Sequence, residues 1–263
     1  MLLGKYAMRF SLGLIIGLLL TFISHTAKSS TPGLVIASDA IQPHVAIDSD
    51  GNIYVVFIHK GNICVAVSTD GGKAFGESTI AIDVKGRARG GRQRGPRIGV
   101  DAKKNLAVTA PVTFDDAEYK KRYPTAELYL VTSSDGGLTW STPRQVNEVS
   151  KKAPEGLHWT AVAPTGEVHI AWLDIRSRRA HGQDIYYTKV TKGEVGENIK
   201  VASTVCECCA PGLAIDGDGN PFLAFREGGD KPSREIYAIR SVDKGNSFGK
   251  AIQINRRESR ESG

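Results

Sequence analysis

The stretch CVAVSTDGGKAF, residues 64–75, decides the fold, because the pattern Ser-x-Asp-x-Gly-x-x-aromatic within it recurs twice along the chain. The second copy is SSDGGLTW at residues 133–140, and the third is SVDKGNSF at residues 241–248. Each copy directly follows a strand-like apolar run. Three copies in the same setting indicate a structural repeat rather than a single hairpin turn.

Each copy belongs to a larger unit of four strands. Ahead of the first copy stands HVAIDSDGNIYVVFI, which predicts a strand, an Asp-Gly-Asn turn and a second strand. A fourth, intervening unit has the same frame, but its box has decayed to TKGEVGEN. Tandem four-stranded units of about 50 residues predict an all-β chain that folds as a β-propeller of antiparallel blades. The predicted blades cover about residues 42–84, 96–150, 157–204 and 210–255.

These repeats resemble the Asp boxes, also called BNR repeats, of the sialidase superfamily, over about residues 40–255. The resemblance implies a sialidase-like β-propeller domain at residues 33–255, in which residues 33–38 look like an N-terminal strand. Such propellers usually have about six or more blades, so four visible units indicate a chain truncated from six. A compact four-bladed ring is the alternative. The resemblance is specific for the fold and much less so for the activity.

The start of the chain has the layout of a secretory signal peptide over residues 1–27. Lys5 and Arg9 precede an apolar run, and small residues follow around Ala27. We therefore expect a secreted or periplasmic protein without stable membrane insertion after cleavage. An uncleaved N-terminal membrane anchor is the alternative. At the other end, residues 256–263 form a polar tail.

Charge and composition argue against nucleic acid as a partner, and the resemblance implies a glycan or another anionic ligand instead. The chain of 263 residues carries a modest formal net charge of +6. Its basic stretch KGRARGGRQRGPR, residues 85–97, has no aromatic interleaving and no DNA-binding motif. We therefore expect no nucleic-acid partner, and the sequence makes no prediction of the oligomeric state.

The position of the boxes indicates on which of the two faces of the propeller each polar residue lies. In the family that the chain resembles, each box lies between the third and fourth strands of a blade. The starts of the first and third strands and the ends of the second strands then lie on the opposite face, where sialidase-like propellers bind ligands. Arginine is enriched there, and its bidentate fork suits an anion better than lysine does. The predicted anion-binding residues are Arg97, Arg176, Arg226 and Arg234.

The resemblance also implies chemistry. Sialidases clamp the sugar carboxylate with three arginines and use a tyrosine nucleophile, assisted by a glutamate, with an aspartate as acid/base. Here Arg176 and Arg226 are the best candidates for the clamp, and Asp174 and Glu155 are candidate general acids or bases. A structural Arg-Asp bridge is the alternative for Asp174. No tyrosine can be assigned as the nucleophile, because those of the third strands fit packing between blades.

The leading prediction is an exported exo-α-sialidase-type glycoside hydrolase acting on acidic or sialylated glycans. The alternative is a non-catalytic propeller that binds a glycan, a protein or a metal ion. Metal binding is suggested by the CECC run, which could hold Zn²⁺ or Cu⁺ with an imidazole, although no cofactor is required. Disulfides and plain buried thiols remain open for the same residues. The candidate metal ligands are Cys206, Cys208, Cys209 and His158.

The boxes themselves are predicted to be structural. The Asp accepts backbone N–H bonds, the Gly takes a positive φ, and the aromatic residue plugs the blade. The acidic ladder of a calcium-binding EF-hand is absent from them. The residues concerned are Ser68, Asp70, Gly72, Phe75, Ser133, Asp135, Gly137, Trp140, Ser241, Asp243, Gly245 and Phe248.

Overall fold

The computed structural model describes residues 33–88, 90–91, 93–121, 126–153, 156–177, 182–229 and 235–255. The chain divides into two compact units, Met1–Gly33 and Leu34–Gly263, and the fold below is that of the second. The predicted signal peptide and the polar tail at residues 256–263 lie outside the described residues. Within the described ranges, no helix is both long and apolar enough to cross a membrane.

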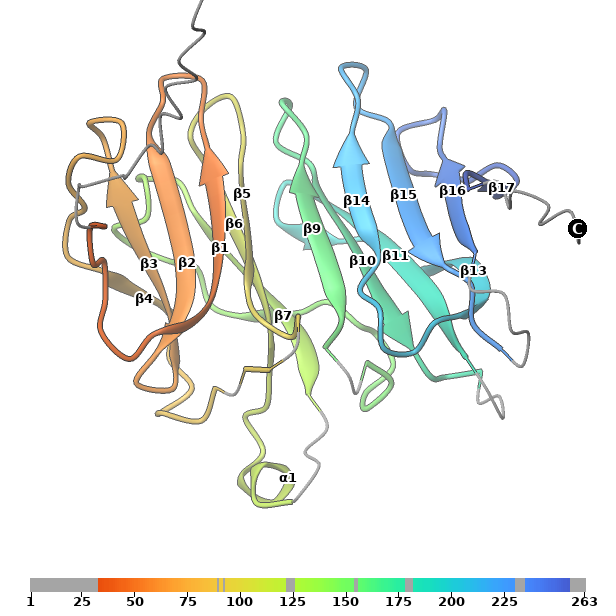
Figure 1. Ribbon diagram of the computed structural model, residues 1–263, viewed down its shortest axis with the longest axis horizontal. Helices are drawn as coiled ribbons and strands as arrows, with labels where there is room; N and C mark the ends of the chain where they lie inside the picture. The colour runs from red at the N-terminus through yellow and green to blue at the C-terminus, as the bar shows by residue number, and fades with distance from the viewer. Residues whose placement is uncertain are drawn as a thin grey trace, which may run out of the picture. The chain divides into compact units, whose positions relative to one another are not determined.

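Four antiparallel sheets follow one another in chain order, as Figure 1 shows, which confirms the predicted fold class. The first contains β1 (Ile41–Ile47), β2 (Ile53–His59), β3 (Asn62–Ser68) and β4 (Thr79–Ile82). The second contains β5 (Arg97–Val100), β6 (Leu106–Val112), β7 (Glu127–Ser133) and β8 (Arg144–Gln145). The third contains β9 (His158–Val162), β10 (Val168–Asp174), β11 (Gln183–Thr191), β12 (Glu194–Val195) and β13 (Ile199–Val205). The fourth contains β14 (Gly212–Ile215), β15 (Pro221–Arg226), β16 (Ile236–Arg240) and β17 (Ile252–Gln253).

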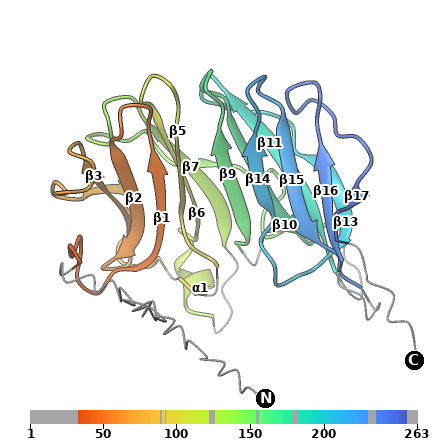
Figure 2. The same cartoon turned by 45° about the horizontal axis from the view of Figure 1, so that its top comes forward.

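The sheets meet through their first strands. β5 packs beside β1, β9 beside β5 and β14 beside β9, an order that can be followed in Figure 2. Gly99 of β5 allows one close approach, because a Cβ there would lie 2.5 Å from Val162 Cγ2 of β9. Separate apolar clusters fill the spaces between successive sheets, as for Ile98 with the first sheet and Leu213 with the third. The core is therefore divided among the contacts between blades.

The outer face of the first sheet is not covered in the same way. In the described part of the chain β14 does not pack closely on β1, so the four sheets do not close into the compact ring that was the alternative. Ile41, Val45 and Ile47 of β1 are 49%, 53% and 61% exposed. Residues 33–38 form no strand, contrary to the prediction. Instead Ala37 packs against the outer side of the first sheet.

The three Ser-x-Asp turns share one set of hydrogen bonds. In the second, Ser133 Oγ donates to Asp135 Oδ1 over 2.7 Å and accepts from Gly137 N over 2.9 Å. The same two contacts occur at Ser68 and at Ser241. The Gly in each turn has a φ between +83° and +94°, which disfavours any other residue. The turns are therefore closed by hydrogen bonds among their own residues.

The aromatic residue of a turn reaches the preceding sheet. Trp140 Nε1 donates to Thr79 Oγ1 of β4 over 3.1 Å, and Thr79 Oγ1 donates to Gly137 O over 2.7 Å. Phe248 of the last turn meets Tyr187 of the third sheet edge-on, with ring centroids 4.9 Å apart. The turns thus fasten one sheet to the sheet before it, in addition to closing a hairpin.

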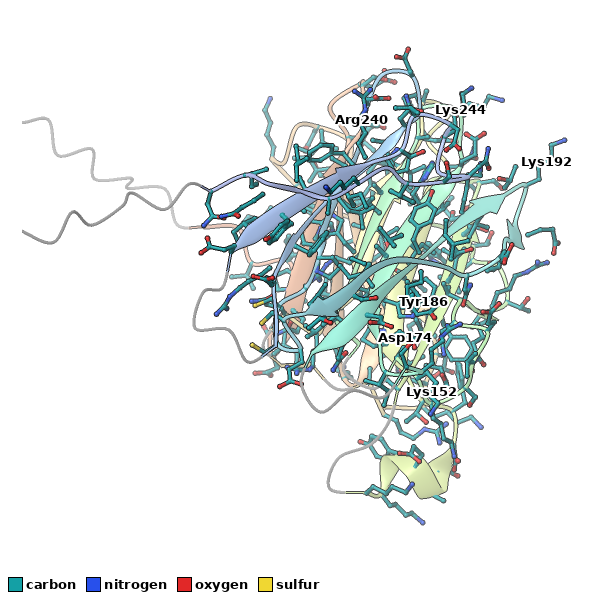
Figure 3. The ribbon with its side chains drawn as sticks, turned by 90° about the vertical axis from the view of Figure 1, so that its right-hand side faces the viewer. Lys152, Asp174, Tyr186, Lys192, Arg240 and Lys244 are labelled. Carbon is teal, nitrogen blue, oxygen red and sulfur yellow. The ribbon has the colours of Figure 1, made fainter. Side chains whose placement is uncertain are left out.

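The starts of the first strands lie at the end of the sheets opposite these turns. Because β1, β2 and β3 run antiparallel in sequence, the end of β3 lies beside the end of β1 and away from its start. The short helix α1 (Asp116–Tyr119), between β6 and β7, marks the end where the first strands begin (Figure 1). Figure 3 shows Asp174 and Lys152 toward that end, and Arg240 and Lys244, beside the last turn, toward the other. We call the end where the first strands begin the mouth.

Candidate functional site

A cation lies buried where the first strands begin. The Arg97 side chain is 7% exposed, and its guanidinium lies over the Trp159 ring at 5.0 Å from the centroid. Its Nη1 donates to the carbonyls of Gly95 and Pro96, and its Nη2 donates to that of Gln93 over 2.9 Å. Its Nε–H has no partner among the described residues. Burial lowers the pKa of Arg97, and in the described part of the chain no carboxylate offsets this charge.

Two histidines accompany Arg97 and stay neutral. His44 Nδ1 accepts from Ile98 N over 3.2 Å, and the His44 ring meets Trp159 edge-on. Burial and the charge of Arg97 lower the pKa of His44 to about 4 and that of the fully buried His158 to about 3. An anion entering here would therefore meet a single cationic group. We call His44, Arg97, His158 and Trp159 the first-strand cluster.

Asp174 and Arg176 form a buried ion pair. The Asp174 side chain is 0% exposed, and its oxygens accept from Trp172 Nε1, Arg176 N, Arg176 Nε and Arg176 Nη2 at 2.8–3.1 Å. Arg176 also binds Glu148 and lies 3.7 Å from the Tyr186 ring centroid. This is the structural bridge that the sequence left as the alternative for Asp174. The Arg176 fork is occupied by protein carboxylates.

A cavity of about 210 Å³ opens beside this ion pair. Asp184 lies directly opposite Asp174 in the register of β10 and β11 and is 1% exposed. Side chains directly opposite on neighbouring antiparallel strands point to the same face, with Cβ atoms about 4.5–5.5 Å apart. Three carboxyl groups, those of Asp174, Asp184 and Glu207, thus border one cavity at the mouth end of the third sheet. Its lining is Asp174, Ile175, Ser177, Gly182, Gln183, Asp184 and Glu207.

Three cysteines gather in the loop between β13 and β14, and we call them the thiol cluster. Cys206 Sγ lies 3.0 Å from Cys209 Sγ and 3.3 Å from Cys208 Sγ. Arg226 Nη1 donates to Cys209 Sγ over 3.3 Å. Burial raises the pKa of Cys209 to about 11, aided by Cys206. Burial also acts to raise the pKa of Cys206. Hydrogen bonds with Cys209 and Cys208 and the charge of Arg226 outweigh burial, so the pKa of Cys206 is lowered.

His158 does not belong to the thiol cluster, contrary to the prediction of a mixed site. Its Nε2 is 3.0 Å from Thr109 Oγ1, and its Nδ1 is 3.0 Å from Gly156 O, so both ring nitrogens are engaged elsewhere. Among the described His, Cys, Asp and Glu residues, the group that could hold a metal ion here consists of the three cysteines alone. Cys64 lies apart from the cluster and is buried in β3.

The predicted arginines are not brought into one array. Arg97, Arg176 and Arg226 contact three different sets of partners, and the other predicted residues, Arg234 and Glu155, lie outside the described residues. The tyrosines of the third strands are engaged as well. Tyr187 Oη is 2.6 Å from His169 Nδ1, and Tyr237 stacks on Phe225.

Gln93 links two parts of the mouth that the sequence analysis did not connect. Its carbonyl accepts from Arg97, and its side-chain Oε1 accepts from Ala210 N over 3.4 Å, directly after the thiol cluster. Gln93 and Trp159 were not among the predicted residues. The only sequence signal for Trp159 was its place beside His158 at a first-strand start, and Gln93 lay in a basic loop without any pattern.

Comparison with known proteins identifies the fold. No family model matches the sequence, and no curated protein matches it. A Hadza microbial sialidase matches with a TM-score of 0.52 and 19% identity, over 78% of this chain and 45% of that one. The leech intramolecular trans-sialidase complexed with 2,7-anhydro-Neu5Ac matches with a TM-score of 0.54 and 14% identity, over 86% and 54%. The GH93 α-L-arabinofuranosidase of Fusarium graminearum matches with a TM-score of 0.51 and 13% identity, over 82% of this chain and 66% of that one.

These likenesses concern the fold alone, and the chain spans about half of the length of the two sialidase structures. They agree with the four tandem antiparallel sheets and with their packing through the first strands. The chain therefore has the fold of the sialidase-like β-propellers.

Proposed function

We propose that the chain is an exported, glycan-active propeller that binds acidic or sialylated glycans at the mouth and hydrolyses them as an exo-α-sialidase-type glycoside hydrolase. The observation that carries the proposal is Arg97. It is a buried cation with an unpartnered Nε–H, and it forms no ion pair with a described carboxylate. A carboxylate or sulfate of a sugar would supply the missing counter-charge through a charge-assisted hydrogen bond. Similar solved structures include a sialidase and a trans-sialidase, which supports this class of ligand.

The proposal assigns roles to the other mouth residues. Arg226 and Arg234 assist Arg97 in binding the acidic group, and Glu155 serves as general acid or base. Asp174, whose two carboxylate oxygens are engaged by Trp172 and Arg176, holds Arg176 in place. Asp184, which is 1% exposed and lines the cavity beside Asp174, is a further candidate for the general acid or base.

The test is an assay of the full chain with a fluorogenic sialoside, alongside Arg97→Lys and the control Arg240→Lys. Lys keeps the charge of Arg97 but not its fork, so we expect a loss of about tenfold or more in kcat/KM. Arg240 pairs with Asp216 at the opposite end of the sheets, and its replacement should leave turnover unchanged. No release of sialic acid by the wild-type chain would refute the sialidase activity.

A non-catalytic glycan-binding propeller is the second candidate. It is favoured by the tyrosines of the third strands, which are engaged in packing and hydrogen bonds rather than facing an open site. Calorimetric titration with sialyllactose separates the two functions. Binding that Arg97→Lys weakens, without any turnover, would establish the binding function. Absence of both binding and turnover would refute both.

A further inference from the structure

The thiol cluster has a geometry that neither glycan binding nor packing requires. The Sγ atoms of Cys206, Cys208 and Cys209 all lie within 4.8 Å of one another. The loop is turned back by a backbone bond from Cys209 N to Cys206 O over 3.4 Å. Three thiols so close together are a concentrated set of soft ligands.

The framework that holds the sulfur atoms does not depend on them. Cys206 N donates to Arg226 O over 2.9 Å, and Gly228 N donates to Thr204 O over 2.8 Å, so the N-terminal side of the loop is tied to the end of β15. On the far side, Ala210 N donates to Gln93 Oε1. The thiols are therefore held together by backbone bonds rather than by a bond between sulfur atoms.

Charge and access also suit a bound cation. Three thiolates bound to a monovalent ion leave two negative charges, and the Arg226 guanidinium, 3.3 Å from Cys209 Sγ, offsets part of that charge. Cys206 is buried, Cys209 is half-buried and Cys208 is exposed. An ion can thus enter at Cys208 and come to rest against Cys206.

The ligand set distinguishes between metals. Structural Zn²⁺ is almost always bound by four ligands, whereas Cu(I), a soft ion that thiolates bind well, does not require a fourth ligand. The described part of the chain brings no imidazole or carboxylate into the cluster. With a metal–sulfur bond of about 2.3 Å, a trigonal site has its sulfur atoms about 4 Å apart. Reaching that spacing from 3.0 and 3.3 Å needs shifts of about 1 Å or less, which the half-buried Cys209 and the exposed Cys208 can supply.

We propose that Cys206, Cys208 and Cys209 form a three-thiolate site for a soft monovalent metal ion of the Cu(I) type. The site shares Arg226 with the proposed glycan site, but Cu(I) binding by the three thiolates requires neither glycan binding nor turnover. Arg226 compensates its charge, and Gln93 connects its loop to Arg97.

The experiment is an anaerobic titration of the reduced full chain with Cu(I), in competition with a chromogenic Cu(I) chelator. We expect one ion per chain and X-ray absorption that shows three sulfur ligands. Cys206→Ser, Cys208→Ser and Cys209→Ser should each weaken Cu(I) binding by about tenfold or more, because a hydroxyl is a poor ligand for a soft ion. Cys64→Ser in β3 is the matched control and should retain the wild-type affinity.

Cys208→Ser distinguishes a loss of Cu(I) binding from a loss of folding. Because Cys208 is exposed, we expect this variant to fold like the wild type. Full Cu(I) affinity in Cys208→Ser would overturn the three-thiolate site. So would Zn²⁺ bound in preference to Cu(I) with a fourth, non-sulfur ligand. A Cys206–Cys209 disulfide in the isolated protein, together with no Cu(I) uptake after its reduction, would overturn the proposal as well.

Discussion

The guanidinium of Arg97 lies 5.0 Å from the centroid of the Trp159 ring, so a buried cation joins the first strand of the second sheet to that of the third. Its remaining polar contacts are to backbone carbonyls. A double-mutant cycle with Arg97→Met and Trp159→Leu measures this contact. We expect a coupling energy of about 1–2 kcal/mol, because the pair is desolvated. The free energies of unfolding come from urea denaturation. If the double variant loses as much as the two single variants together, the contact between Arg97 and Trp159 contributes nothing to stability.

The neutral histidines predict a loss of stability in mild acid. The folded-state pKa values of His44 and His158, about 4 and about 3, lie below the ordinary value of 6.5, so only the unfolded chain takes up their protons as the pH falls below 6.5. The contribution of these two histidines to the free energy of unfolding is therefore constant well above pH 6.5. Below it, stability falls by about 1.4 kcal/mol per pH unit for each histidine until the folded pKa is reached.

Urea denaturation between about pH 7.5 and pH 5 checks this slope, a range in which most carboxyl groups stay ionised. We expect His158→Gln to be less stable overall because it loses the contacts of the imidazole ring. Its free energy of unfolding should fall less steeply with decreasing pH, because unfolding of the variant takes up one proton fewer. Parallel slopes for the variant and the wild type would contradict the assignment of His158 as a neutral group.

The Ser-x-Asp turns should matter for stability and not for ligand binding. Ser133→Ala removes a hydroxyl that both donates to Asp135 and accepts from Gly137, at a position 4% exposed. We expect a loss of about 1–2 kcal/mol in the free energy of unfolding. The exposed Ser78 is the matched control, and Ser78→Ala should change stability by less than about 0.5 kcal/mol. Reduced glycan affinity in folded Ser133→Ala would show that the two ends of the sheets are coupled.

Replacing either partner of the Asp174–Arg176 ion pair should lower the free energy of unfolding. Arg176→Leu alone leaves the fully buried Asp174 without its charged partner, and we expect a loss of about 3 kcal/mol or more. Asp174→Leu should cost less, because the half-buried Arg176 keeps its ion pair with Glu148. The double variant should lose less than the sum, because neither charge remains. Calorimetric melting of the three variants measures this. A single variant that melts like the wild type would mean that the pair is not structural.

Contact between β5 and β9 depends on Gly99. The Cβ of Gly99→Ala would lie 2.5 Å from Val162 Cγ2, closer than such atoms approach, and we expect a loss of about 1–3 kcal/mol. Val162→Ala in the same chain removes the clashing methyl groups and should restore part of that loss. If Gly99→Ala is as stable as the wild type, the two strands lie further apart than described.

The repeat made the fold predictable because it is encoded locally. A Ser, an Asp and a Gly within five positions satisfy one another's hydrogen bonds, as Ser133, Asp135 and Gly137 do, so the turn and the hairpin around it follow from neighbouring residues. Chain direction in antiparallel strands then places Arg97 and His158 at the end away from the turns. The predicted strand at residues 33–38 failed because a short apolar segment does not by itself specify a pairing partner.

The partners at the mouth were decided only by the tertiary structure. Sequence alone determined that arginines, histidines and cysteines gather at one end of the sheets. It did not determine that Arg176 is held by Asp174 and Glu148, that Arg97 lies on Trp159, or that His158 binds Thr109 instead of the thiols. Such contacts join residues from different strands and different sheets, and their lengths depend on how the sheets pack. Hydrogen bonds and ion pairs act over only a few ångströms, so a strand register sets the end at which a side chain lies but not which partner it meets.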